Sequence, residues 1–227
     1  IPSFIHITTA RVHDVNIMDL IPYEKGSFYV ADKAYTDFNR LHRIHASESF
    51  FVIRAKENLQ FQRMYSRAVD KAKGVIHDQV GSFMGPKSRT EYPEKLRRIK
   101  YYDAEHDLDL VFLTNNMDLK ATEIAFLYKK RWEVELFFKW MKQHLKIKSF
   151  WGVTLNAVKI QMYCAIIAYC LVALVGYKLK VGRPIYEILQ ILSISLLDKA
   201  PVKEILTRCD YNNVKELKNN QLIISGF

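Results

Sequence analysis

The sequence predicts an α/β protein, and three features of the chain carry this prediction. Within the first 55 residues, short apolar stretches rich in β-branched residues alternate with helix-forming stretches, the order typical of α/β folds. Residues 120–147 contain neither glycine nor proline and predict one long helix. Between these two regions lie short strand-like segments punctuated by glycine, which predict a β-rich insertion.

The first part of the predicted core, residues 1–57, contains an apolar run that ends on the carboxylate of Asp32. Thr36 or Asp37 is then placed to cap a helix that ends near Ala46. The elements predicted for this part are a strand at 4–12, a short helix at 14–20, a strand at 27–31, a helix at 37–46 and a strand at 50–55.

The remaining chain divides into a β-rich insertion at 58–118, a second core part at 119–180 and a helical C-terminal region at 181–227. The insertion carries six cations, which suggest a surface for a polyanion. These cations are Lys87, Arg89, Lys95, Arg97, Arg98 and Lys100. Expected strands are 75–83, 96–102 and 108–113, the last two joined as a hairpin through 103–106, and expected helices are 120–147, 155–180 and 184–192.

The charge balance favours a polyanionic partner. Lys and Arg outnumber Asp and Glu by 34 to 24, giving a net charge of +10. The three cysteines, Cys164, Cys170 and Cys209, show no paired spacing and fit buried, reduced thiols in a cytosolic protein. The chain opens without the features of a signal peptide, and its apolar run at 160–177 is interpreted as a buried helix and not as a membrane segment.

Four polar residues of the 120–147 helix fall on one narrow stripe. At about 100° per residue, Tyr128, Arg131, Glu135 and Lys142 lie within about 60° of one another. The remaining circumference is mostly apolar, so the helix is expected to pack into protein on nearly every other side. On an ordinary amphipathic helix, the pair of Arg131 and Glu135 would contribute only a few tenths of a kcal/mol.

The spacing Tyr-x2-Arg-x3-Glu-x6-Lys, formed by Tyr128, Arg131, Glu135 and Lys142, resembles the signature of DDE transposases of the insertion-sequence-four type. The segment 29–35 resembles the surroundings of the second catalytic Asp in this family, with Ala34 where these enzymes commonly have glycine. The resemblance covers nearly the whole chain. It implies a ribonuclease-H-like mixed sheet with flanking helices that lacks its first strand, together with the insertion and the helical C-terminal region.

The resemblance also implies a metal-dependent phosphoryl transfer on DNA. Asp32 and Glu135 would be catalytic residues and ligands of Mg2+, with Mn2+ as an alternative. Tyr128, Arg131 and Lys142 would hold phosphate oxygens. Lys139 and Lys146 fall on the same stripe of the helix and extend this DNA-binding row.

Two further sets of residues keep alternative interpretations. Arg54 and Lys56, after the strand at 50–55, either contact DNA phosphates or pair with Glu57 and its neighbours. Phe83 and Tyr92 are candidates for the insertion aromatic that stacks on a flipped base in relatives that form a hairpin intermediate.

The chain is expected to be the C-terminal part of a transposase catalytic domain, because the family's first catalytic Asp lies on a strand upstream of everything present. Asp14 precedes Asp32 by only 18 residues, which is too close for that position. The chain alone should bind metal poorly and cut DNA slowly or not at all.

The parent enzyme is expected to transpose DNA by cut and paste as a homodimer in the cytoplasm, associated with the nucleoid. Its partners would be double-stranded transposon ends and target DNA, without a membrane. The alternatives are an inactive remnant that acts as a DNA-binding module and another nuclease of the same fold.

Overall fold

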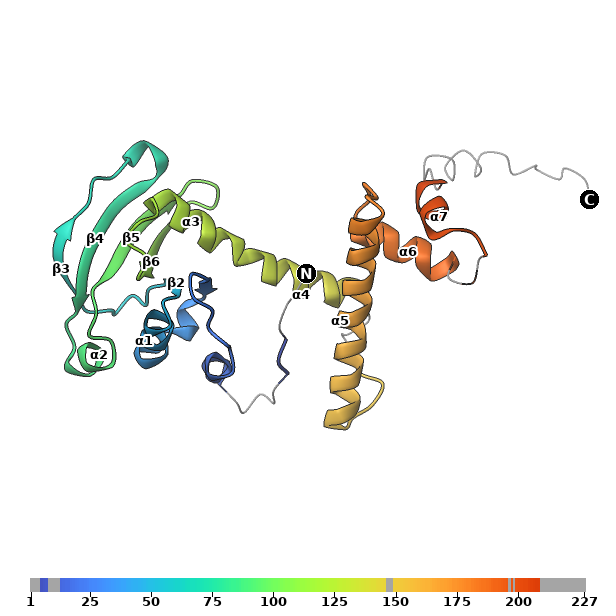
Figure 1. The fold of residues 1–227 in the computed structure, drawn as a ribbon, viewed down its shortest axis with the longest axis horizontal. Helices are drawn as coiled ribbons and strands as arrows, with labels where there is room; N and C mark the ends of the chain where they lie inside the picture. Colours follow the sequence, from blue (N-terminus) through green and yellow to red (C-terminus); the bar gives the residue numbers. More distant parts are fainter. Residues whose placement is uncertain (1–4, 8–12, 146–148, 196, 198, 209–227) are drawn as a thin grey trace, which may run out of the picture. The chain divides into compact units, whose positions relative to one another are not determined.

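The computed structural model describes residues 5–7, 13–145, 149–195, 197 and 199–208 (Figure 1). The chain separates into two compact units, the first from His6 to Phe137 and the second from Phe138 onward, together with Ile5. Most of the strand predicted at 4–12 lies outside the described residues, and residues 5–7 are not in a strand.

The first unit is built on one six-stranded mixed sheet, which confirms the predicted α/β class and is compatible with a ribonuclease-H-like fold. The strand order is β1-β2-β6-β5-β4-β3, with β1 and β2 parallel and all other neighbours antiparallel. The strands are β1 (Phe28–Ala31), β2 (Phe50–Arg54), β3 (Phe61–Ser66), β4 (Val75–Phe83), β5 (Leu96–Asp103) and β6 (Leu108–Thr114). Because β6 pairs directly with β2, the strands of the predicted insertion continue the same sheet.

Helices cover parts of both faces of this sheet, because successive side chains of a strand point to opposite sides. Phe51 and Ile53 of β2 lie in a core packed against α1 (Phe38–Ala46) and η1 (Asp14–Asp19), and α2 (Pro86–Glu91) contacts α1 and β4. Val52, between them, lies in the opposite core beneath α3 (Ala121–Lys130). Alternation along one five-residue strand therefore separates the two cores.

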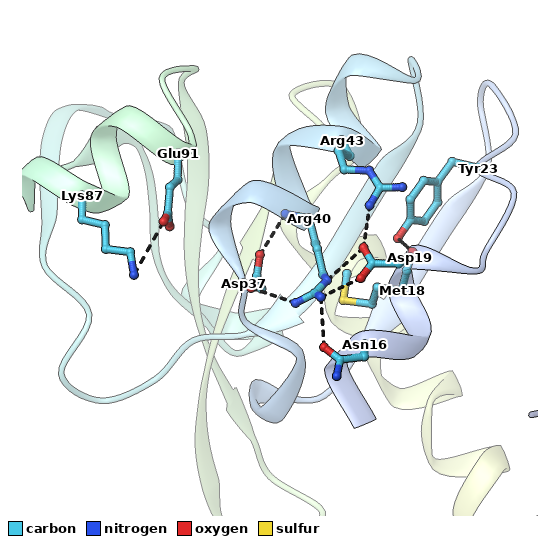
Figure 2. A network of polar contacts seen from close by, with 9 residues as sticks. All are labelled: Asn16, Met18, Asp19, Tyr23, Asp37, Arg40, Arg43, Lys87 and Glu91. Atoms are coloured by element: carbon cyan, nitrogen blue, oxygen red, sulfur yellow. Dashed lines mark hydrogen bonds and ion pairs between the residues drawn. The ribbon is translucent and has the colours of Figure 1, made fainter. Parts of the chain in front are cut away.

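A polar network fastens η1, the short helix that precedes β1, to α1 (Figure 2). The carboxylate of Asp19 accepts hydrogen bonds from Arg40 at 2.6 Å and from Arg43 at 2.5 Å. Arg40 also donates to Asn16 and to Asp37, the N-cap residue of α1, each at 3.0 Å. The hydrogen bond from Arg40 is the main cause that lowers the pKa of Asp19. The chain leading into β1 is thereby held against α1.

A buried ion pair connects β4, β5 and the start of α3. The guanidinium of Arg97 donates to both carboxylate oxygens of Asp78, at 2.7 and 2.6 Å, and the two side chains are 1% and 4% exposed. Its remaining nitrogen donates to the carbonyl of Leu119 at 2.6 Å, in the loop between β6 and α3. Arg97 therefore ties two strands to the segment from which α3 begins.

The helix predicted at 120–147 is divided at Arg131 into α3 and α4 (Trp132–His144). The N–H of Arg131 donates to the carbonyl of Tyr128, and the N–H of Val134 donates to the carbonyl of Arg131, both at 3.0 Å. These bonds between residues three apart tighten the turn, so the regular α-helical ladder is interrupted although Arg131 keeps a helical backbone conformation.

The prediction that this helix packs into protein on nearly every side is also wrong for α4, whose apolar side chains are largely exposed. Trp132, Val134 and Leu136 are 50–55% exposed, because the core beneath the sheet takes side chains from α3, including Tyr128, and none from these positions.

The second unit contains the end of α4 together with α5 (Leu155–Lys178), α6 (Ile185–Ser195) and α7 (Val202–Arg208). Its core joins Val172 of α5 to α6 and α7, so only part of α5 is covered. Ile167 and Leu171 are 55% and 58% exposed, and Cys164 is exposed, contrary to the burial expected for this helix and its thiols. By length and composition alone, α5 is apolar enough to cross a membrane. Cys209 lies outside the described residues.

The two aromatic residues considered for base stacking are core residues, so that prediction is wrong. Phe83 is 1% exposed and Tyr92 is fully buried, and their rings pack edge to face at 5.7 Å. Tyr92 also forms a hydrogen bond with Nδ1 of His45 at 2.8 Å, between α1 and the segment after α2. Burial raises the pKa of Tyr92 and lowers the pKa of His45.

This environment of His45 predicts a loss of stability in mild acid. Because its folded-state pKa lies below the unfolded value of 6.5, its contribution is complete above about pH 6.5 and declines as the pH falls below that value. The urea concentration at the midpoint of unfolding should differ more between pH 7.5 and pH 5.5 for the wild type than for His45→Gln. An equal pH dependence in both proteins would contradict this assignment.

Candidate active site

Two structural elements bring the predicted site residues together. Asp32 directly follows β1 and is half-buried, and its carboxylate accepts the backbone N–H of Lys33 at 2.5 Å as the cap of the short helix η2 (Lys33–Tyr35). Tyr128 lies in the last turn of α3, 7% exposed, with its ring 4.8 Å from that of Phe112 on β6. The end of β1 and the end of α3 therefore supply the two sides of the site.

Arg131 contacts one side of the site, and the charge of Asp32 on the other side raises its pKa. Its Nη1 donates to Oε1 of Glu135 at 2.7 Å, and its guanidinium lies 5.4 Å from the centre of the Tyr128 ring. Burial acts to lower the pKa of Arg131, but the hydrogen bond to Glu135 and the negative charges of Glu135 and Asp32 outweigh it and raise the pKa. Both predicted catalytic carboxylates therefore act electrostatically on the same guanidinium.

Tyr128 and Arg54 belong to the same group. Burial chiefly raises the pKa of Tyr128, and the charge of Asp32 adds to the increase while Arg131 and Arg54 oppose it. Arg54 ends β2 and pairs with Phe112, so its side chain is on the sheet face that α3 covers. Asp32, Arg54, Tyr128, Arg131 and Glu135 thus form one local electrostatic cluster.

The remaining predicted residues are outside this cluster. Lys56 is exposed in the loop after β2. Lys139 and Lys142 are exposed in the part of α4 that belongs to the second unit, and Lys146 lies outside the described residues.

A cavity of about 230 Å³ lies beside Tyr35, at the end of η2. Burial raises the pKa of Tyr35, and the carboxylates of Asp14 and Asp32 add to the increase, so both acids lie near its ring. The cavity is lined by His6, His13, Asp14, Asn16, Ile17, Leu20 and Tyr35.

The oxygen donors of Asp32 and Glu135 are of the kind that Mg2+ prefers, and an ion of this class often takes only one or two protein carboxylates. A second group with metal-ligand spacing, Asp103, Glu105 and His106, lies at the turn between β5 and β6. There the ammonium of Lys129 is 2.9 Å from Asp103 and 3.3 Å from Glu105, so a cation already occupies that position. Glu135 is likewise paired with a protein cation, Arg131, at 2.7 Å.

Arg131 also has an unused donor that suits an anion. Its Nε is buried and has no hydrogen-bond partner among the described residues, although its Nη1 is bound to Glu135. A buried donor left unpaired costs about 1–3 kcal/mol, so an oxygen ligand at this position would remove an existing penalty.

Comparisons with known proteins identify the family of this chain. The sequence matches the family described as "Transposase DDE domain" over residues 1–171. It is 33% identical over 207 residues to the putative transposase y4zB of Sinorhizobium fredii, covering 90% of this chain and 58% of that protein.

Two other relatives are named for insertion sequences. A probable transposase for insertion sequence element IS5377 of Geobacillus stearothermophilus is 30% identical over 75% of this chain and 45% of its own length. A putative transposase for insertion sequence element IS4SA of a Synechocystis species is 26% identical over 75% of this chain and 47% of its own. The chain thus spans about half the length of these relatives, whose names are consistent with the insertion-sequence-four type. The chain belongs to the DDE transposase family.

Proposed function

We propose that the chain is the catalytic-domain part of a transposase that cuts DNA at transposon ends and joins the freed ends to target DNA. The observation that carries this proposal is the cluster around Arg131, which combines two carboxylates, a buried tyrosine and an unpaired guanidinium donor. Phosphoryl transfer needs both kinds of group, because carboxylates hold divalent cations and guanidinium groups hold phosphate oxygens.

In this proposal Asp32 and Glu135 hold Mg2+, or Mn2+ in its place. Bound divalent cations would assist the attacking oxygen and neutralise charge on the leaving oxygen. Arg131 donates to a phosphate oxygen through its free Nε, and Tyr128 and Arg54 border the same phosphate. Lys139, Lys142 and Lys146 follow the DNA backbone, and Lys56 adds a contact near Arg54.

A third carboxylate is proposed to come from a strand that pairs with β1. In the described sheet β1 has β2 as its only neighbour, and Asp32 directly follows β1. A strand added at that edge would bring its own side chains close to Asp32, since neighbouring strands lie about 4.8 Å apart. This placement matches the position of the first catalytic Asp implied by the family resemblance.

The active assembly is proposed to be a homodimer that holds two transposon ends and works on the nucleoid in the cytoplasm. The second candidate function is an inactive remnant that only binds DNA. It is favoured by the ion pair that already joins Arg131 to Glu135, because in the described state this carboxylate is neutralised by protein.

A cleavage assay separates these two functions. The chain, extended at its N-terminus to the length of its relatives, is incubated with duplexes that carry the transposon end. Cleavage with Mg2+ and none with EDTA is the expected result. DNA binding without cleavage in either Mg2+ or Mn2+ would instead assign the remnant function.

The proposed lysine row predicts a particular salt dependence. Lys139→Ala and Lys142→Ala should weaken the binding of all duplex sequences, and each should reduce the slope of log K against log salt by about 0.9 for one lost phosphate contact. Fluorescence anisotropy over a salt series measures this slope. Lys203→Ala, which removes an exposed cation from α7, should leave it unchanged. Equal binding by all four proteins at low salt would count against the lysine row.

A further inference from the structure

The outer strands β3, β4 and β5 leave part of one sheet face uncovered, and this surface is separate from the cluster around Arg131. Directly paired residues of antiparallel strands point to the same face. The pairs are Arg63 with Gly81, Gln79 with Arg98, and His77 with Lys100. Gly81 also pairs with Leu96, which belongs to the core on the side of α1 and α2. The paired residues of β4 and β5 are even numbers of residues away from Gly81 and Leu96, so all three pairs lie on that face of the sheet, opposite α3. We call Arg63, His77, Gln79, Arg98 and Lys100 the Arg98 face.

Helices α1 and α2 cover only one end of this face. The core on this side includes Phe83 and Leu96, at the ends of β4 and β5 nearest α2. Farther along the same strands, His77 and Arg63 are exposed, while Arg98 and Lys100 are half-buried. The strands themselves therefore present a row of basic side chains.

Arg98 is the central group of this row, and no carboxylate of the described residues pairs with it. Its guanidinium donates to the amide oxygen of Gln79 at 2.7 and 3.3 Å and lies 4.7 Å from the centre of the Phe61 ring. Burial lowers the pKa of Arg98, in agreement with a partly desolvated cation that no carboxylate in the described part of the chain compensates. A partly buried charge without an ionic partner is costly, and an anionic ligand would offset that cost.

The neighbouring residue, Arg97, supports the fold and differs from Arg98 in its partners. Arg97 points to the opposite face, where Asp78 and backbone carbonyls engage its guanidinium. On the Arg98 face, Lys100 has an acidic partner, Asp109, at 2.7 Å. The described charged side chains on this face of the sheet have a net charge of 3 − 1 = +2, from Arg63, Arg98 and Lys100 against Asp109.

We propose that the Arg98 face binds the phosphodiester backbone of duplex DNA at a surface distinct from the cluster of Asp32, Arg131 and Glu135. Nε and Nη2 of Arg98 donate to Gln79, so its Nη1 would donate to a phosphate oxygen, and Arg63 is a second cation, on strand β3. The basic side chains are spread over three neighbouring strands, β3, β4 and β5, and an extended phosphodiester backbone can reach several of them. This inference rests on the proposed function, which supplies DNA as the partner.

The test uses Arg63→Gln, Arg98→Gln and the double variant of the 227-residue chain with a labelled 20-base-pair duplex of arbitrary sequence. The slope of log K against log salt should fall by about 0.9 in each single variant and by about 1.8 in the double variant. Lys203→Gln is the control, because it removes one positive charge from an exposed position of α7, outside the sheet. Thermal melting shows whether each variant is folded, and Arg63→Gln alters only an exposed side chain.

Each outcome bears on one of the two proposals. An unchanged slope in folded Arg63→Gln and in the double variant, with a reduced slope in Lys139→Ala, would overturn the Arg98 face and leave the proposed function standing. An equal loss in Lys203→Gln would also overturn it, since the effect would then come from net charge. If the wild-type chain binds no duplex even at low salt, the proposed function fails as well.

Discussion

Replacing Asp78 with alanine is expected to lower the free energy of unfolding by about 3–5 kcal/mol, because removal of one partner leaves a buried charge uncompensated. Arg97 is 1% exposed and relies on Asp78 for a two-point carboxylate contact. The carbonyls of Leu119 and Asn116 accept its Nη1 but carry no charge that replaces the lost carboxylate. Urea denaturation monitored by circular dichroism measures the change.

The chain provides a matched control for this prediction in Asp109→Ala. Asp109 on β6 pairs with Lys100 on β5 at 2.7 Å, but the two side chains are 49% and 36% exposed. Loss of such a pair should cost less than about 1 kcal/mol. Similar losses in both variants would show that burial does not set the strength of the Asp78 pair.

A double replacement distinguishes the burial of charge from a general need for contacts at this position. Asp78→Leu together with Arg97→Met removes both charges and keeps apolar volume. Replacing a buried pair in this way is often neutral. The double variant should therefore be more stable than Asp78→Ala alone. A double variant as unstable as the single one would mean that the bonds from Arg97 to Leu119 and Asn116 carry most of the stability.

The segments with a strong apolar pattern were predictable from the sequence. The strands at 28–31, 50–54, 75–83, 96–103 and 108–114 and the helix at 38–46, capped by Asp37, all occur where pattern and capping chemistry place them. The strand β3 was not predicted, because five of its six residues are exposed and its side chains show no apolar alternation. Only its pairing with β4 makes it a strand, and such long-range pairing leaves no local signal.

Part of the site was also predictable, because it depends on local spacing in the sequence. The spacing of four residues between Arg131 and Glu135 predicts their contact on any helix, and the ion pair is present at 2.7 Å. The different environments of Arg97 and Arg98 were not predictable, since they depend on which face each neighbour takes. That choice follows from the register between β4 and β5, in which Arg97 pairs with Val80 and Arg98 pairs with Gln79. Including the buried Arg97 in the basic patch of the insertion was therefore wrong.

Replacing Glu135 with glutamine is expected to abolish most end cleavage by the protein extended to the length of its relatives. The change keeps the size of the side chain and removes the charge that a divalent cation requires. Loss of outer groups that only orient metal ligands costs about 10–100-fold, so loss of a ligand itself should cost at least about 100-fold. Single-turnover cleavage of a duplex bearing the transposon end, with Mg2+ in excess, measures the effect.

The neighbouring Glu133 separates this effect from a general loss of charge on α4. Glu133 is exposed and pairs with Lys130 at 2.9 Å, whereas Glu135 pairs with Arg131 beside Asp32. Glu133→Gln should therefore cleave like the wild type, although both variants lose one negative charge from the first turn of the same helix. Because Glu135 is 44% exposed, its loss should lower the free energy of unfolding by less than about 1 kcal/mol. Full cleavage by folded Glu135→Gln would remove this carboxylate from the catalytic set, and Asp32 would then need partners from elsewhere.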